Sequence, residues 1–150
     1  MSQLKDRIRR FARLQTLAKA DERRAGLALR GARHHLDQEA ARLRELVGYA
    51  GSPPANAEPA VHRVNRERFA AKLRLAMNQQ QRVVSHAASS LSEARAAWFG
   101  ARRNTERFDA ALRELEKGQQ AEDARRLMRE LDEHAARQFA RRRAQERSHN

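Results

Sequence analysis

The sequence predicts an all-α fold: a long antiparallel two-helix coiled-coil hairpin with a C-terminal helical extension. Three observations support this prediction. The 150-residue chain is rich in Ala, Leu, Arg, Glu and Gln, a composition typical of long helices and coiled coils. All three prolines fall within one short stretch, 53–59. On each side of that stretch, apolar residues recur with the seven-residue spacing of a coiled-coil seam.

The first helix is predicted over residues 3–50. Its seam positions run from 4 to 50 at alternating spacings of four and three residues, and eleven of the fourteen are apolar. The polar exceptions are Gln15, Glu22 and Glu39. Apolar residues at only two positions in seven form a narrow stripe that suits one partner helix.

A loop is predicted at 51–59, because Pro53 and Pro54 lack amide donors and clash with a preceding helical turn. The second helix follows over 60–146. Its seam runs from position 70 to position 115, and twelve of fourteen positions are apolar. The register then fails around Gly118, where a weakened turn is expected, and a separate apolar stripe follows at Leu127, Leu131, Ala135 and Phe139.

Bringing the two seams together predicts which residues face each other. With the turn centred near residue 55, position i lies opposite about 110 − i, which places Phe11 beside Trp98 and Leu46 beside Val64. The N-terminus of the first helix then lies opposite about residue 106 of the second helix. The remaining part of the second helix has no partner within the chain, so its apolar stripe is expected to fray or to bind another protein.

Composition excludes several classes of protein. The absence of Cys excludes disulfides, Cys-ligated zinc and thiol catalysis. No apolar stretch approaches the ~20 residues of a transmembrane helix, and the charged N-terminus lacks the apolar core of a secretory signal. The net charge of +13 favours an acidic partner, either nucleic acid or a protein surface, unless the charge merely solvates the helix faces.

No catalytic, cofactor or metal site is predicted. Residues 26–31 have the glycine spacing of a phosphate-binding loop, but Ala32 and Arg33 replace the required Lys and Ser/Thr. His34 and His35 are adjacent and point to different faces of a helix, so they cannot ligate one metal together. A two-helix coiled coil also lacks a water-excluding pocket for acid–base chemistry. The chain is therefore expected to be non-enzymatic.

Charge and aromatic placement indicate where partners bind. The first 24 residues hold eight Lys and Arg against three acids, and residues 137–147 carry a net charge of +4. Such regions bind phosphate backbones or acidic protein surfaces, so a basic nucleic-acid-binding, nucleoid-associated hairpin is an alternative function. A structural coiled-coil dimer is a third. Near the loop, Tyr49 and Phe69 are expected to be partly exposed, as a docking surface or as packing for the loop.

Several short motifs occur along the chain in a recognisable order. They are LRELVGY at 43–49, Phe69 with Leu73 and Ala76 after the loop, Trp98 followed by basic residues, and LDEHAAR at 131–137. Together with the unequal hairpin and the chain length, these motifs resemble the FliJ family of the bacterial flagellar export apparatus. Injectisome stalk proteins share the architecture, and the resemblance does not separate the two systems.

The resemblance implies a stalk protein that is cytoplasmic, peripheral at the inner membrane, and free of cofactors. Its open end would insert into the hexameric export ATPase ring and promote ring assembly and ATP hydrolysis. Its other end would bind the cytoplasmic domain of the membrane export gate protein. Export chaperones are left open as further partners, nucleic acid is not expected, and the isolated protein is expected to be a monomer.

These expectations define two sets of residues. The tip set, matched to family positions for gate binding, comprises Arg42, Leu46, Tyr49, Phe69, Leu73, Ala76 and Gln80. The C-terminal set, expected to bind the ATPase, comprises Leu127, Leu131, Asp132, Glu133, Arg137, Phe139, Arg141, Arg142 and Arg143.

Overall fold

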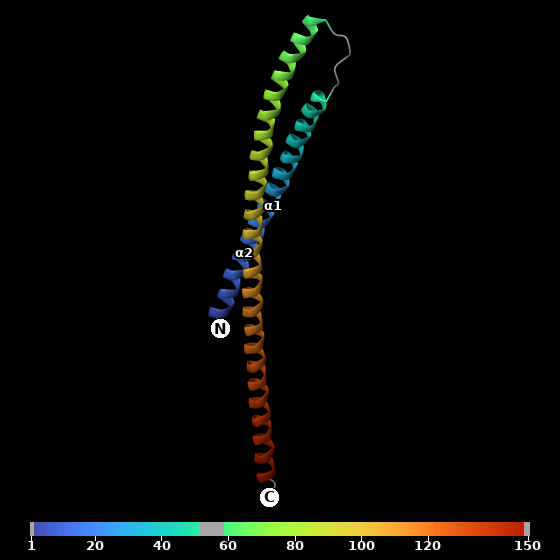
Figure 1. Ribbon diagram of the computed structural model, residues 1–150. Helices are drawn as coiled ribbons and strands as arrows, with labels where there is room; N and C mark the ends of the chain where they lie inside the picture. Colours follow the sequence, from blue (N-terminus) through green and yellow to red (C-terminus); the bar gives the residue numbers. More distant parts are fainter. Residues whose placement is uncertain (1, 52–58, 149–150) are drawn as a thin grey trace. The chain divides into compact units, whose positions relative to one another are not determined.

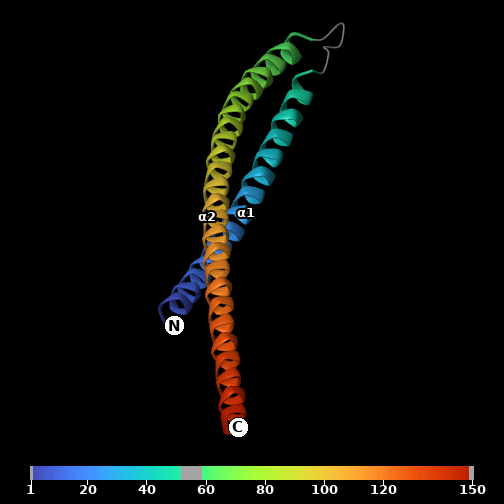
Figure 2. The same ribbon diagram turned by 90° about the horizontal axis from the view of Figure 1, so that it is seen from below.

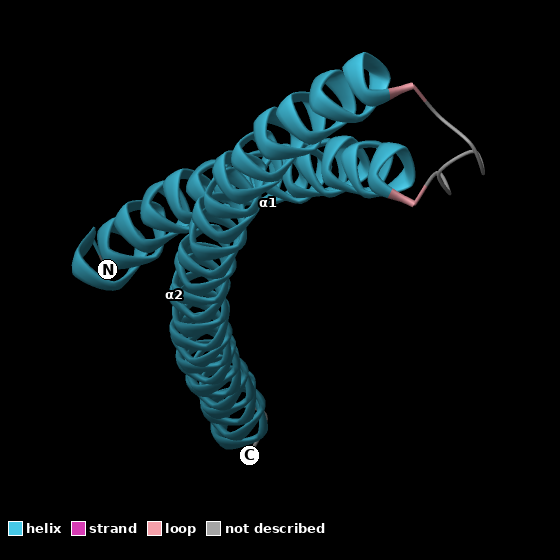
Figure 3. Cartoon of the chain, turned by 45° about the horizontal axis from the view of Figure 1, so that its top comes forward, coloured by secondary structure: helices cyan, strands magenta, loops and turns pink. Residues whose placement is uncertain are grey.

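A computed structural model describes residues 2–51 and 59–148, and the chain forms two long helices there (Figure 1). Helix α1 spans Ser2–Ala50 and helix α2 spans Ala60–Ser148. The described ranges contain no strand (Figure 3). The predicted all-α hairpin is confirmed, although the Pro53-Pro54 turn lies outside the described residues. Helix α2 continues through Gly118, so the expected weak turn does not interrupt it.

The chain divides into two units. The central unit, Lys19–Arg103, contains the later part of α1 and the first part of α2. The terminal unit combines the residues up to Ala18 with those from Asn104 onward. Within each unit, one stretch of α1 lies beside one stretch of α2 that runs in the opposite direction (Figures 1 and 2).

Burial in both units follows the predicted seams. Every seam position of α1 from 4 to 46, and every seam position of α2 from 70 to 115, is buried or half-buried. Among the described residues, the buried apolar side chains are Ala18, Leu73 and Ala87. A seam between only two helices covers each side chain from one side, which explains why so few residues are fully enclosed.

The pairing of the helices in the central unit differs from the predicted one. Gln80 of α2 contacts Glu39 of α1, and Trp98 lies against Gly26. The numbers of facing residues therefore add up to 119 and 124, not to 110. The expected packing of Trp98 on Phe11 is wrong, since the indole has a different neighbour.

The terminal unit shows the same shift. The rings of Phe11 and Phe108 meet edge to face with centroids 6.3 Å apart, and Gln15 donates a hydrogen bond of 2.6 Å to Asp109. Half-buried positions of α2 continue as far as Gln119, so α1 reaches about thirteen residues further along α2 than the predicted limit near 106. Every residue from 120 to 145 is exposed.

The shift leaves the start of α2 beyond the stretch that packs on α1 in the central unit. Position 46 falls opposite position 73, where Leu73 is buried, whereas Val64 is exposed; the expected contact between Leu46 and Val64 is therefore wrong. Residues 59–69 are all exposed. The physical reason for the shift is that polar seam residues find polar partners across the seam, as Glu39 does with Gln80, and such pairs select one register.

Candidate functional site

The tip set lies in the central unit, on the last turns of α1 and the first turns of α2. Its two aromatic side chains are largely in water: Tyr49 is 67% exposed and Phe69 is 58% exposed. Three more apolar residues near the same helix ends, Val47, Val61 and Val64, are exposed as well. Several exposed apolar residues near the two helix ends are available for contact with another protein.

Sequence reasoning did not single out Val47 and Val61, and it expected Val64 to pack on Leu46. The signal that reveals them is their position outside the heptad seams, because an apolar side chain that falls off a two-helix seam has no partner to cover it.

The rest of the tip set serves the packing of the hairpin. Leu73 is buried, Leu46 and Ala76 are half-buried, and Gln80 is hydrogen-bonded to Glu39. Only Arg42, Tyr49 and Phe69 of the seven residues are exposed. The tip set thus combines an exposed part, available to a partner, with a seam part that holds the helices together.

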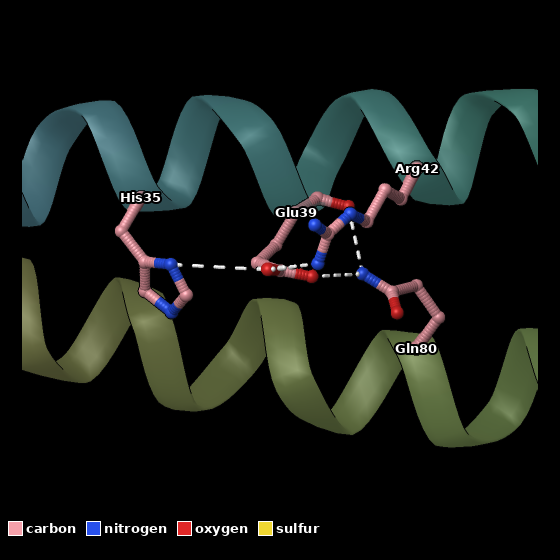
Figure 4. Close-up of polar contacts among 4 residues, drawn as sticks. All are labelled: His35, Glu39, Arg42 and Gln80. Atoms are coloured by element: carbon pink, nitrogen blue, oxygen red, sulfur yellow. Dashed lines mark hydrogen bonds and ion pairs between the residues drawn. The ribbon is translucent and has the colours of Figure 1, made fainter.

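Glu39 is the centre of a polar cluster on the seam (Figure 4). The residue is only 5% exposed. Gln80 Nε2 donates to Glu39 Oε2 at 2.7 Å and to the Glu39 backbone oxygen at 2.9 Å. Arg42 Nη1 lies 2.7 Å from Oε1, and His35 Nδ1 lies 3.8 Å from the same oxygen. The cluster therefore joins both helices through one carboxylate.

The hydrogen bond from Gln80, helped by the charge of Arg42, lowers the pKa of Glu39 below its ordinary value, although burial opposes the effect. The carboxylate is therefore ionised at neutral pH. Among the described residues, no second carboxylate shares its hydrogen bonds, so the arrangement gives no acid–base pair. Its physical consequence is a fixed register, because sliding either helix would leave a charged group buried without these partners.

The C-terminal set lies on α2 in the terminal unit, and all nine of its residues are exposed. The large apolar members include Phe139, which is 65% exposed, and Met128 is a further exposed apolar residue beside them. The Arg143 guanidinium lies 5.8 Å from the centre of the Phe139 ring, and Arg137 forms an exposed ion pair of 3.0 Å with Glu133. The stretch thus presents apolar and cationic groups together.

The described residues contain no group of three or more His, Cys, Asp or Glu side chains that could hold a metal ion. In the same residues, neither helix includes an apolar stretch sufficient to cross a membrane.

Comparison with known proteins agrees with this architecture. A model of the flagellar FliJ protein family matches residues 7–144, which is nearly the whole chain. Neither the curated proteins nor the solved structures give a match. Because the family match runs through both helices and the loop between them, the chain belongs to the flagellar FliJ family, whose members are non-catalytic components of the flagellar export apparatus.

Proposed function

We propose that this protein is the stalk of the export ATPase complex, and that the C-terminal set inserts into the hexameric ATPase ring. One observation carries the proposal. From residue 120 to residue 145, α2 is an entirely exposed helix that still carries large apolar side chains. A helix of this kind gains little from its own chain, and packing on a partner supplies what is missing.

The charges of this segment suit the interior of a protein ring. Arg137, Arg141, Arg142 and Arg143 are all exposed near its end. A guanidinium forms two parallel hydrogen bonds with a carboxylate, so these arginines would both attract and orient acidic groups in a pore. Leu127, Leu131 and Phe139 would contribute apolar contact area beside them.

The tip set would bind the cytoplasmic domain of the export gate, which makes the protein peripheral at the cytoplasmic face of the inner membrane. The exposed aromatic residues Tyr49 and Phe69 support this part of the proposal. Aromatic side chains are frequent anchors of protein interfaces because they bury a large area at low entropic cost.

Truncation tests the ATPase contact. A chain that ends at Glu130 keeps every residue of α2 up to Gln119, the last half-buried position, so the packing of α1 on α2 is retained. We expect it to remain helical and to lose its stimulation of the purified ATPase. Full stimulation by the truncated chain would refute the stalk proposal, whereas a loss of DNA binding with unchanged ATPase stimulation would favour the nucleic-acid alternative.

A charge series sharpens this test. Replacing the four arginines of the C-terminal set with Gln should weaken stimulation about tenfold, and more at low salt than at high salt, because exposed charges are screened over about 10 Å at 0.1 M. A matched control replaces four exposed arginines of the central unit with Gln, namely Arg63, Arg68, Arg74 and Arg82. Equal losses of ATPase stimulation in the two variants would show that the net charge of the protein, and not the position of the arginines, causes the effect.

The gate contact has a separate test. The double variant Tyr49→Ala and Phe69→Ala should weaken binding to the isolated gate domain, with a cost of about 1–3 kcal/mol for each true anchor. The matched control is Leu75→Ala with Phe99→Ala, which also removes two exposed apolar side chains of the central unit. Equal gate affinity in the two double variants would refute the proposed contact.

A further inference from the structure

An open groove runs along α1 in the central unit, and none of its lining residues belongs to the tip set or the C-terminal set. Six residues between Lys19 and Arg30 and the indole of Trp98 line it, and it has a volume of about 600 Å³. The six α1 positions follow helical spacings of three, one, three, one and three residues, so they share one face of the helix. We call this feature the Trp98 groove.

Gly26 shapes the groove. A Cβ atom placed there would lie 3.6 Å from both Cδ1 and Nε1 of Trp98, so the indole edge rests against the α1 backbone. The ring of Phe99 lies 5.0 Å from the indole, and the Arg102 guanidinium lies 5.5 Å from the ring centre. Trp98 is therefore held on its own helix while one edge remains part of the groove wall.

The groove combines positive charge with apolar surface. Lys19, Arg23 and Arg30 supply three cations against the single carboxylate of Glu22. Among the described residues, neither Arg23 nor Arg30 forms an ion pair, and the Nε of Arg23 donates only to the backbone oxygen of Lys19 at 3.3 Å. Leu27 lies between them and is 62% exposed. An occupant must therefore offer both carboxylates and an apolar side chain.

We propose that the Trp98 groove binds an acidic amphipathic helix of a partner protein. The lining of α1 extends over twelve residues, from Lys19 to Arg30, which is about 16 Å or three helical turns. Carboxylates spaced along a partner helix would meet Arg23 and Arg30, while a Leu-type side chain would lie on Leu27 and the Trp98 edge. Glu22 disfavours a phosphate backbone, and Arg102 occupies one face of the indole on which a nucleobase would have to stack.

This proposal does not depend on the stalk assignment, because no residue of the groove belongs to the tip set or the C-terminal set. It is also directly observable, since Trp98 is the only tryptophan of the chain. The fluorescence of the intact protein therefore reports on the groove without any label.

The experiment titrates the full-length protein with a designed helical peptide of about 15 residues that has Glu and Leu on one face and no aromatic residues. We expect a saturable change in Trp98 emission, and a much smaller change with a scrambled peptide of the same composition. The variant Arg23→Gln with Arg30→Gln should bind about tenfold more weakly. The matched control, Arg33→Gln with Arg44→Gln, removes the same charge from α1 outside the groove and should bind like the unmodified protein.

A shape variant separates the groove from simple charge attraction. Gly26→Leu fills the groove and leaves the charge unchanged, so it should abolish the response while circular dichroism still shows a helical protein. The proposal would be overturned if the two arginine double variants weakened peptide binding equally, or if the scrambled peptide gave an equal change in Trp98 emission. It would also be overturned by a stronger response to a mixed-sequence oligonucleotide, or by emission that changes with protein concentration as a dimer forms.

Discussion

Glycine-to-alanine substitutions in the central unit should stabilise the protein. Gly26 and Gly31 lie inside α1 and Gly100 lies inside α2, where glycine costs about 1 kcal/mol relative to alanine because it loses more backbone freedom on folding. At Gly31 and Gly100, an added Cβ would meet nothing within 4 Å. At Gly26 it would lie 3.6 Å from the Trp98 edge, an ordinary van der Waals distance, so all three positions have room for a methyl group.

Each substitution is therefore expected to raise the free energy of unfolding by about 1 kcal/mol, and the triple variant by about 3 kcal/mol, since the three sites share no neighbour. For a chain of this size each step corresponds to a Tm increase of about 2–4 °C. Thermal and urea melts followed by circular dichroism at 222 nm measure the effect. Destabilisation by Gly31→Ala or Gly100→Ala would refute the reasoning, because only an unseen neighbour could clash with a methyl group in open space.

Three further predictions concern buried or half-buried polar and aromatic residues. Because the pKa of Glu39 is lowered in the folded state, its carboxylate stabilises the fold at pH values above the ordinary Glu pKa of about 4.3, and this stability is lost as the pH falls through the lower folded-state pKa. Glu39→Gln should remove that part of the acid transition in pH-dependent melts. Gln119→Leu should raise Tm slightly, because the amide Oε1 of Gln119 is buried without a hydrogen-bond partner among the described residues, and an unchanged or lower Tm would contradict this. Phe108→Ala should lower the free energy of unfolding by roughly 1.5–2.5 kcal/mol, about half the cost for a fully buried Phe, and should speed hydrogen exchange in residues 2–18, with Phe11→Ala giving the same pattern.

The seams were predictable because their signal is local. Apolar residues at four- and three-residue spacings can form a continuous stripe only on a helix, and these are the positions that the structure buries. The loop was predictable for the same kind of reason, because proline restricts its own backbone whatever the rest of the chain does.

The register was harder to predict because it depends on pairs of residues that are far apart in the sequence. Centring the turn in the loop assumes that both helices begin to pack directly beside it, yet the first half-buried position of α2 is Ala70. The polar residues at seam positions indicate the register. Matching Glu39 of one seam to Gln80 of the other gives the observed alignment, and a wide Trp98 opposite Gly26 agrees with it.

The candidate site was predictable only in part, for a related reason. A heptad pattern identifies which residues face a partner helix, but exposure also depends on where that partner ends. The exposure of Tyr49 and Phe69 agrees with the sequence-based expectation, whereas Leu73 and Gln80 of the same set serve the seam. The Trp98 groove could not be predicted, because it needs the relative position of residues on two helices.

The register also links the fold to the proposed function. Helix α2 has 89 residues and α1 has 49, so α2 must leave residues unpaired, and the register decides where. Had the facing numbers added up to 110, residues 60–69 would lie beside the end of α1, and the surroundings of Phe69 would be covered. The observed pairing instead leaves 59–69 exposed in the central unit and 120–145 exposed in the terminal unit. Because both stretches carry exposed apolar side chains, the polar pairs of the seam determine which surfaces of α2 are left for other proteins.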